Sequence, residues 1–253
     1  MENKKQHLKI IGIIPSRYGS TRFPGKPLVD IDGKSMIQRV YEQSTKSTLL
    51  SKVVIATDDE RIMSHVREFG GTAVMTSPQH FSGTDRCAEI IRMDENSDWD
   101  AVINIQGDEP YIQPEQIDLL CHCFDSSDTT IATLIKEIKS SDELFNHNNA
   151  KVILNKNSEA IYFSRAPVPY CRNYPDQEWI KHHTYYKHIG IYGYRVKTLL
   201  EIALLPKTKL EVTESLEQLR WVENGYKINT AITSFESIAI DTPDDLLRIK
   251  TNA

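Results

Sequence analysis

A basic loop follows the first apolar segment of the chain. Residues 15–27 (PSRYGSTRFPGKP) come directly after the apolar run 8–14 and contain Arg17, Arg22 and Lys26. Turning backbone N–H groups and fixed positive charge can together replace the hydration shell of a triphosphate. Arg holds two phosphate oxygens with its planar fork, whereas Lys can follow charge that moves during a reaction. The loop therefore predicts a phosphate site with these three cations as ligands.

The same composition also fits an ordinary surface loop, because Gly, Pro, Ser and basic residues are common there. Phosphate binding is favoured, since three cations follow the first strand of an α/β pattern and ligands bind at the carboxyl ends of such strands. The loop is not a P-loop: Gly19 and Gly25 are one residue too far apart, and Pro27 occupies the Ser/Thr position. No G-x-G-x-x-G pattern occurs here either.

Two acidic residues are candidate metal ligands. Asp108 follows the apolar strand 100–105, on the sheet edge where the basic loop is also expected, and this is a suitable place for a Mg²⁺ ligand. The next helix begins well at Pro114, so Asp108 is not needed as a cap. Asp241 has two interpretations that the residues leave open. It is either the N-cap of a closing helix that begins at Pro243 or a second carboxylate at the metal.

Residues 82–86 (SGTDR) place hydroxyls, backbone N–H groups and a carboxylate at the start of a helix. Two roles are open for this segment. It recognises a nucleotide base, or it only caps the helix, in which case Asp85 and Arg86 lie at the surface.

Strand and helix patterns alternate in the first half of the chain. Buried strands are expected at 8–14, 52–57, 72–75, 100–105 and 131–135. Helices that begin near Ser35, Asp59, Ser82 and Pro114 separate them. Such alternation with short connections predicts an α/β fold with a doubly wound, mostly parallel sheet.

The pattern changes after residue 150. Strands 151–154 and 160–163 predict a hairpin, and residues 165–183 predict a long irregular excursion. On the strand 185–196, Tyr192 and Tyr194 are expected to share a face suited to a polyhydroxylated ligand. A helix over 211–223 and a strand over 227–232 follow. The inward face of that helix is expected to carry Val212, Leu216, Leu219 and Val222.

Composition limits the function. The net charge of -5 argues against a nucleic-acid partner. No apolar run of about 18 residues suggests a membrane span, and the start is unlike a signal peptide, so we expect a cytoplasmic protein. The four cysteines are expected to be reduced. Neither Cys121-His122-Cys123 nor His182-His183 has the spacing of a metal site.

Seven segments, in this order, resemble the 3-deoxy-D-manno-octulosonate (Kdo) cytidylyltransferase family. They are residues 15–27, SGTDR at 82–86, QGDEP at 106–110, YFSRA at 162–166, KHIGIY at 187–192, LEQLR at 216–220 and DTP at 241–243. The first segment alone indicates only a nucleotidyltransferase. The segments at 187–192 and 216–220 indicate the acidic sugar.

The resemblance implies that CTP and Kdo give CMP-Kdo and pyrophosphate with Mg²⁺. It also implies a homodimer. By analogy, Arg17, Arg22, Lys26 and Asp108 are catalytic. The nucleotide contacts Pro15, Arg17, Ser20, Arg22, Lys26, Ser82, Gly83, Thr84, Asp85 and Arg86. The sugar contacts Gln106, Arg165, His188, Tyr192, Glu217 and Gln218, and the metal is held by Asp108 and Asp241.

The same resemblance divides the single domain 1–253 into three parts. Residues 1–135 form a nucleotide-binding half, 136–230 an inserted β-rich region for the sugar and the dimer contact, and 231–253 a return to the main sheet. Related acceptors, 8-amino-Kdo or sialic acid, remain the alternative for the same chemistry. A nucleotidyltransferase for a neutral sugar phosphate and a non-catalytic nucleotide-binding regulator are the other candidates.

Overall fold

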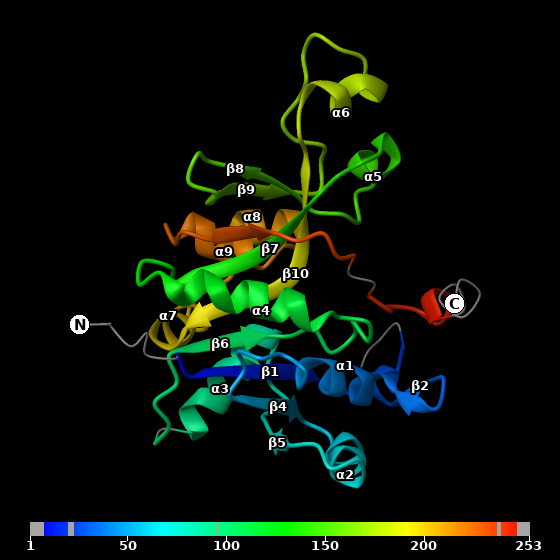
Figure 1. Cartoon of the computed structure of the whole chain (residues 1–253), viewed down its shortest axis with the longest axis vertical. Helices are drawn as coiled ribbons and strands as arrows, with labels where there is room; N and C mark the ends of the chain where they lie inside the picture. The colour runs from blue at the N-terminus through cyan, green and yellow to red at the C-terminus, as the bar shows by residue number, and fades with distance from the viewer. Residues whose placement is uncertain (1–7, 20–22, 95, 237–238, 247–253) are drawn as a thin grey trace.

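A computed structural model describes residues 8–19, 23–94, 96–236 and 239–246. In these residues a mixed main sheet crosses the molecule, with strand order β11-β7-β10-β6-β1-β4-β5 and the hairpin β8-β9 attached to β10 (Figure 1). Along that order only β10 runs antiparallel to its neighbours. The predicted α/β fold with a mostly parallel sheet is therefore confirmed.

The strands of the main sheet are β1 (Ile10–Ser16), β4 (Lys52–Thr57), β5 (Ala73–Met75), β6 (Ala101–Asn104), β7 (Ile131–Glu137), β8 (Lys151–Leu154), β9 (Ala160–Ser164), β10 (Tyr186–Arg195) and β11 (Asn229–Ile232). The short strands β2 (Asp30–Ile31) and β3 (Lys34–Ser35) pair separately. The helices are α1 (Met36–Ser44), α2 (Glu60–Glu68), α3 (Gly83–Met93), α4 (Pro114–His122), α5 (Ser141–Phe145), α6 (Trp179–His182), α7 (Val196–Ile202), α8 (Lys209–Glu214) and α9 (Gln218–Glu223).

Alternation along the buried strands creates two hydrophobic cores, one on each face of the sheet. In β1, Ile11 and Ile13 pack in the core that contains α3, α7 and α9, whereas Ile10 and Ile14 pack in the core that contains α1, α2 and α4. Both faces of the central strands are therefore covered, which explains why their sequences are continuously apolar.

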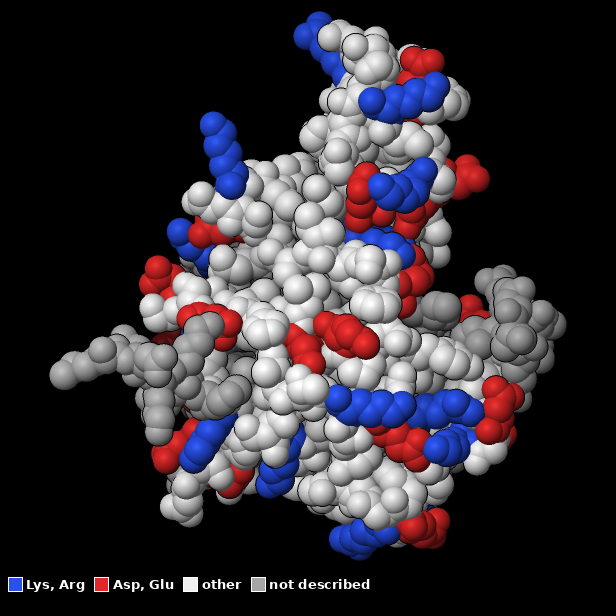
Figure 2. All heavy atoms as spheres, viewed as in Figure 1, with Lys and Arg blue, Asp and Glu red and all other residues white. Residues whose placement is uncertain are grey.

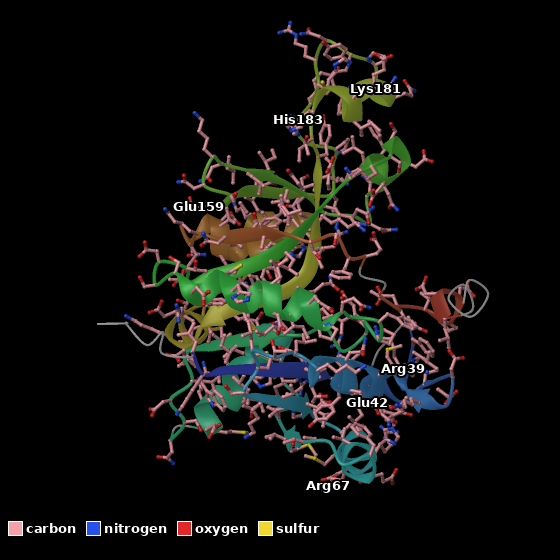
Figure 3. All side chains as sticks on the ribbon, in the orientation of Figure 1. Arg39, Glu42, Arg67, Glu159, Lys181 and His183 are labelled. Carbon is pink, nitrogen blue, oxygen red and sulfur yellow. The ribbon has the colours of Figure 1, made fainter. Side chains whose placement is uncertain are left out.

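The hairpin was predicted correctly, and it extends the main sheet through a pairing of β8 with the start of β10. The segment after β9 leaves the body of the sheet and carries α6 at its far end, and Lys181 and His183 lie there (Figure 3). Trp179 and Tyr185 are buried in a small hydrophobic core of this region. Side chains from α6 therefore help to hold the excursion together.

One helix prediction was wrong. Instead of a continuous helix over 211–223, the chain forms α8 and α9, separated at Ser215, which has a left-handed backbone with φ of 52°. Val212 was expected to face inward but is 64% exposed, because the break at Ser215 changes the helix register. Leu216 and Leu219 are buried as expected.

Charged side chains of both signs are interspersed over the described part of the face in Figure 2. None of the helices formed by the described residues is long and apolar enough to span a membrane.

Candidate active site

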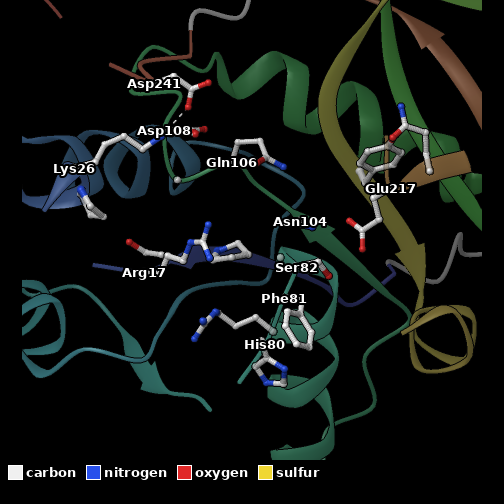
Figure 4. A pocket seen from close by; sticks show the side chains of 18 residues that line it. Arg17, Lys26, His80, Phe81, Ser82, Asn104, Gln106, Asp108, Glu217 and Asp241 are labelled. Carbon is white, nitrogen blue, oxygen red and sulfur yellow. Dashed lines mark hydrogen bonds and ion pairs between the residues drawn. The ribbon is translucent and has the colours of Figure 1, made fainter. Parts of the chain in front are cut away.

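A cavity of about 410 Å³ opens where β1 and β6 end and α3 begins. Both strands run in the same direction, so their carboxyl ends meet at one edge of the sheet. The residues that line the cavity are Pro15, Ser16, Arg17, Lys26, Pro27, His80, Phe81, Ser82, Gly83, Arg86, Asn104, Gln106, Gly107, Asp108, Tyr192, Glu217, Gln218 and Asp241. Charged and polar groups from seven separate parts of the sequence therefore face one space (Figure 4).

At one end of the cavity, Lys26 lies between two carboxylates (Figure 4). Its Nζ is 2.7 Å from Oδ2 of Asp108 and 3.2 Å from Oδ1 of Asp241. The Lys26 side chain is only 13% exposed, so these carboxylates are strong partners for its ammonium group. The two aspartates, which are far apart in the sequence, are thus gathered around one positive charge.

Neither aspartate is needed to cap a helix in this structure. Helix α4 has a capping box formed by Gln113 and Gln116. After Asp241, the Thr242 hydroxyl accepts the Asp245 N–H, and the Asp245 carboxylate accepts the N–H groups of Asp241 and Thr242. The cap of the closing helix is therefore formed by Thr242 and Asp245.

Two features bring the distant segments together. Ile240 is buried against Ile31 and Met36, and its N–H donates to the Asp108 carbonyl at 2.9 Å. At Gly107, an added Cβ would lie 2.7 Å from the carbonyl oxygen of Pro15. Because that contact is with backbone, only glycine permits the end of β1 to approach the turn that carries Asp108 so closely.

The start of α3 forms a second wall of the cavity. Ser82 and Asp85 form a capping box, as the capping interpretation requires, and Ser82 and Gly83 also line the cavity, so both roles of this segment stay open. Arg86 was expected at the surface in the capping interpretation but is buried. Its guanidinium pairs with Asp58 at 2.9 Å and also donates to Thr76. Thr84 and Asp85 do not line the cavity.

Gln106, Tyr192, Glu217 and Gln218 also line the cavity, and Glu217 lies on the far side of it from Lys26 (Figure 4). Gln106 donates to the Gly190 carbonyl at 2.8 Å, and Glu217 accepts from the Thr84 hydroxyl at 3.1 Å. Burial raises the pKa of Glu217, against the opposing effects of Arg220 and Thr84. Four of the six residues predicted to bind the sugar therefore line the same cavity. They lie after β6, on β10 and at the start of α9.

Several buried polar atoms in the cavity have no protein partner. Ser16 Oγ, Asn104 Oδ1, Tyr192 OH and Gln218 Nε2 have no hydrogen-bond partner in the protein, and Glu217 Oε1 has only the Arg220 guanidinium nearby, at 3.8 Å. An unpaired buried polar group is costly, so these atoms are expected to be satisfied by a bound polar molecule or by water. Donors and acceptors occur together in this set, which suits hydroxyl groups because a hydroxyl both donates and accepts.

Asn104 was not predicted as a site residue from the sequence. Ser16 was considered only as part of the basic loop. Asn104 is the last residue of β6 and lies directly opposite Tyr192 on β10. A polar residue at the end of an otherwise apolar buried strand was the available signal. Ser16 ends β1 in the same way and is also buried.

Two residues predicted for the sugar lie outside the cavity lining. The Arg165 side chain donates to the carbonyls of His147, Glu214 and Ser215, and so it connects the end of β9 with the end of α8. His188 lies behind Tyr192, with ring centroids 5.1 Å apart, and contacts Phe163 edge-on. As the side chains lie here, His188 packs against a residue of the cavity wall, and Arg165 bonds to backbone near the end of α8.

Tyr194 also differs from expectation. It is fully buried, with its ring stacked on Tyr192 and perpendicular to Trp221, because the strand turns this side chain into the core beneath α9. Of the two tyrosines, only Tyr192 faces the cavity. Arg22 and Ser20 lie outside the described residues, and the functional roles assigned to all of these side chains stay predictions.

The position of His188 gives a pH prediction. Burial lowers the pKa of His188 to about 3, from about 6.5 in an unfolded chain. Below pH 6.5 the unfolded state therefore binds a proton that the folded state does not, and stability falls. Between pH 7 and pH 5, wild type should lose about 1 to 2 kcal/mol more unfolding free energy than His188→Gln. Urea titrations at both pH values measure this, and equal losses would show that His188 is not held neutral.

The sequence comparisons identify the family. A family model described as cytidylyltransferase matches residues 11–228. A protein named 3-deoxy-manno-octulosonate cytidylyltransferase from Parabacteroides distasonis is 56% identical over 94% of this chain and 96% of its own length. The chain belongs to the 3-deoxy-manno-octulosonate cytidylyltransferase family. A second relative of that name, from Cytophaga hutchinsonii, is 52% identical over 96% of this chain and 97% of its own length.

A solved structure of a member of this family is also similar. It is described as CMP:2-keto-3-deoxy-manno-octonic acid synthetase complexed with CTP, and it matches with a TM-score of 0.88 and 41% identity. The match covers 96% of this chain and 98% of that chain. The resemblance inferred from seven short segments therefore extends through the whole 3-deoxy-manno-octulosonate cytidylyltransferase fold.

Proposed function

We propose that this protein transfers a cytidylyl group from CTP to Kdo, releasing pyrophosphate and forming CMP-Kdo. The observation that carries the proposal is one cavity with two chemically different ends. One end has Lys26 and Arg17 beside two carboxylates, and the other has Tyr192, Glu217 and Gln218. Triphosphate chemistry needs the first set, and a polyhydroxylated acceptor suits the second. The named relatives and the CTP complex of a similar enzyme support it.

Positioning and charge stabilisation are the main tasks in such a reaction. The C2 hydroxyl of Kdo attacks the α-phosphorus in line with the departing pyrophosphate. In our proposal Arg17, Arg22 and Lys26 hold the triphosphate and then the leaving pyrophosphate. Pro15 and the segment Ser82–Arg86 hold the nucleoside. Within that segment, Arg86 acts as a fixed support because Asp58 and Thr76 already engage its guanidinium.

A magnesium ion is expected to assist this reaction, and the residues fit one. Asp108 and Asp241 are already arranged around a cation, the Lys26 ammonium. Hard oxygen ligands of this kind suit Mg²⁺, which usually takes one or two carboxylates and completes its shell with phosphates and water. No group of three or more potential His, Cys, Asp or Glu ligands occurs among the described residues. When bound, the ion would neutralise phosphate charge and favour ionisation of the attacking hydroxyl.

The acceptor would lie against Gln106, Tyr192, Glu217 and Gln218. The polar side chains of Tyr192, Glu217 and Gln218 line this part of the cavity and would bind its hydroxyls, and Asn104 adds another polar group on the same wall. A deoxy analogue would leave a buried group unpaired, and such mismatches cause strong discrimination. Arg165 and His188 would contribute indirectly, by supporting the α8 end and Tyr192.

The wider biological setting is part of the proposal. CMP-Kdo would supply lipopolysaccharide synthesis, and the reaction would occur in the cytoplasm, where CTP is available. We also propose a homodimer, as the family resemblance implied. Two exposed apolar side chains support a contact through the inserted region: Tyr170 is 72% exposed and Ile161 is 53% exposed. Sedimentation equilibrium would measure the mass in solution, and a monomer at micromolar concentration would reject the dimer.

Nucleotide selectivity is a direct test. We expect CTP to react at least about a hundredfold faster than ATP or GTP at equal subsaturating concentrations, because the wrong base leaves polar groups unpaired. Pyrophosphate release with Kdo and each nucleotide measures this ratio. Equal rates with ATP would contradict a cytidine site. An acceptor panel of Kdo, 8-amino-Kdo and sialic acid, each with CTP, tests the sugar in the same assay.

A further inference from the structure

The Lys26 ammonium lies between Asp108 and Asp241, the two carboxylates that would hold a metal ion in the proposed function. It contacts one oxygen of each carboxylate, at 2.7 and 3.2 Å (Figure 4). The Lys26 side chain is 13% exposed, compared with 27% and 40% for the two aspartates. Water therefore reaches the carboxylates more readily than it reaches the lysine. A cation arriving from solvent would meet a pair of carboxylates that another cation already neutralises.

We propose that Lys26 occupies the two carboxylates in the nucleotide-free protein and thereby makes it select the metal–nucleotide complex over the free metal ion. This inference rests on the proposed function, because it assumes that Asp108 and Asp241 are the metal ligands. It adds a second role for Lys26, one that precedes its contact with phosphate.

Electrostatics gives the physical reason. A divalent ion at this position would lie close to a positive charge, and repulsion between like charges is large where water is partly excluded. The ammonium must therefore leave before the ion can bind. It leaves readily only if another anion accepts it, and the triphosphate of an incoming nucleotide is such an anion.

The local backbone permits this movement of the side chain. Gly25 has a left-handed conformation with φ of 73°, and its N–H donates to the Tyr18 carbonyl at 3.1 Å. Lys26 donates its N–H to the Phe23 carbonyl, and Pro27 is buried at the start of a short 3₁₀ helix, Lys26–Leu28. The Lys26 backbone is thus fixed, while its four-carbon side chain remains able to exchange carboxylate oxygens for phosphate oxygens.

Thermodynamic linkage turns this exchange into selectivity. If nucleotide binding removes the ammonium from the carboxylates, it strengthens metal binding, and the metal must strengthen nucleotide binding by the same factor. Removing the ammonium by mutation should strengthen metal binding, as nucleotide binding is proposed to do. A neutral side chain at position 26 would remove one positive charge from beside the two carboxylates, and the nucleotide-free protein would then bind a divalent ion more tightly.

Titration of the nucleotide-free protein with MnCl2, followed by the electron paramagnetic resonance of free Mn²⁺, tests the inference without turnover. Mn²⁺ is a suitable probe because it accepts the same oxygen ligands as Mg²⁺. We expect Lys26→Met to bind one Mn²⁺ at least about tenfold more tightly than wild type, a difference of about 1.4 kcal/mol. Lys34→Met is the matched control, because Lys34 forms an exposed ion pair with Glu42 and should leave the wild-type affinity unchanged.

Asp108→Asn, added to Lys26→Met, locates the ion and should abolish the gain. Equal Mn²⁺ affinity in wild type and Lys26→Met would overturn the inference, and so would a gain that survives Asp108→Asn. Lys26→Gln gives the same comparison with a polar side chain if the Met variant melts at a much lower temperature. Pyrophosphate release by wild type is measured separately, so a failure of the proposed reaction is distinguishable from a failure of this inference.

Discussion

Asp108→Asn is expected to lower turnover by about a hundredfold or more while the melting temperature stays within a few degrees of wild type. Asn keeps the shape of Asp but removes the charge that would hold a magnesium ion. Folding should tolerate the change, because Asp108 is partly exposed and Gln113 and Gln116 already cap α4. Steady-state pyrophosphate release and thermal melts measure the two quantities.

Asp241→Asn provides the comparison, and it should show the same pattern with partial recovery at high Mg²⁺ or with Mn²⁺. The dependence of rate on Mg²⁺ concentration separates the two aspartates. An unchanged Mg²⁺ dependence in Asp241→Asn would leave Asp108 as the only protein carboxylate on the metal. Near-wild-type turnover in both variants would reject the metal assignment.

Arg220→Met is expected to lower the free energy of unfolding by about 3 to 5 kcal/mol. Arg220 forms two bonds to Glu211, at 2.8 and 2.5 Å, and less than a tenth of either side chain is exposed. Burial acts to raise the pKa of Glu211, but its bonds to Arg220 hold the pKa below the ordinary value. Removing Arg220 would leave a buried carboxylate without its charged partner, although the Thr208 N–H would still donate to it.

The double variant Glu211→Leu, Arg220→Met is the control. It removes both charges, and so it should be more stable than Arg220→Met alone, because a buried ion pair can be replaced by apolar groups at low cost. Urea unfolding at 25 °C gives the three free energies. A loss below 1 kcal/mol in Arg220→Met would show that solvent or neighbouring groups compensate the Glu211 charge once Arg220 is removed.

Much of the fold was predictable because the central strands carry continuous apolar runs and the helices have clear caps. Ser35, Asp59 and Ser82 are N-caps as expected. The break between α8 and α9 was not predictable, since it depends on a left-handed Ser215, a conformation that is unusual for any residue other than glycine. Tertiary contacts, such as the Glu211–Arg220 pair across the break, determine it.

The candidate site was predictable to a similar extent. The basic loop and Asp108 follow directly from the rule that ligands bind at strand ends, and residues of both line one cavity. The two interpretations of Asp241 could be compared only in the structure. There, Thr242 and Asp245 bond to the backbone N–H groups at the start of the closing helix. The position of His188 behind Tyr192 depends on an irregularity of β10 between Ile189 and Tyr192, which the linear sequence does not specify.

One assay tests the central claim most directly: pyrophosphate release by the purified protein with CTP, Kdo and Mg²⁺, each omitted in turn. The account predicts release with all three present and a rate near background when any one is missing, together with one CMP-Kdo formed for each pyrophosphate. Release from CTP without Kdo, or no release from the complete mixture by folded protein, would contradict it.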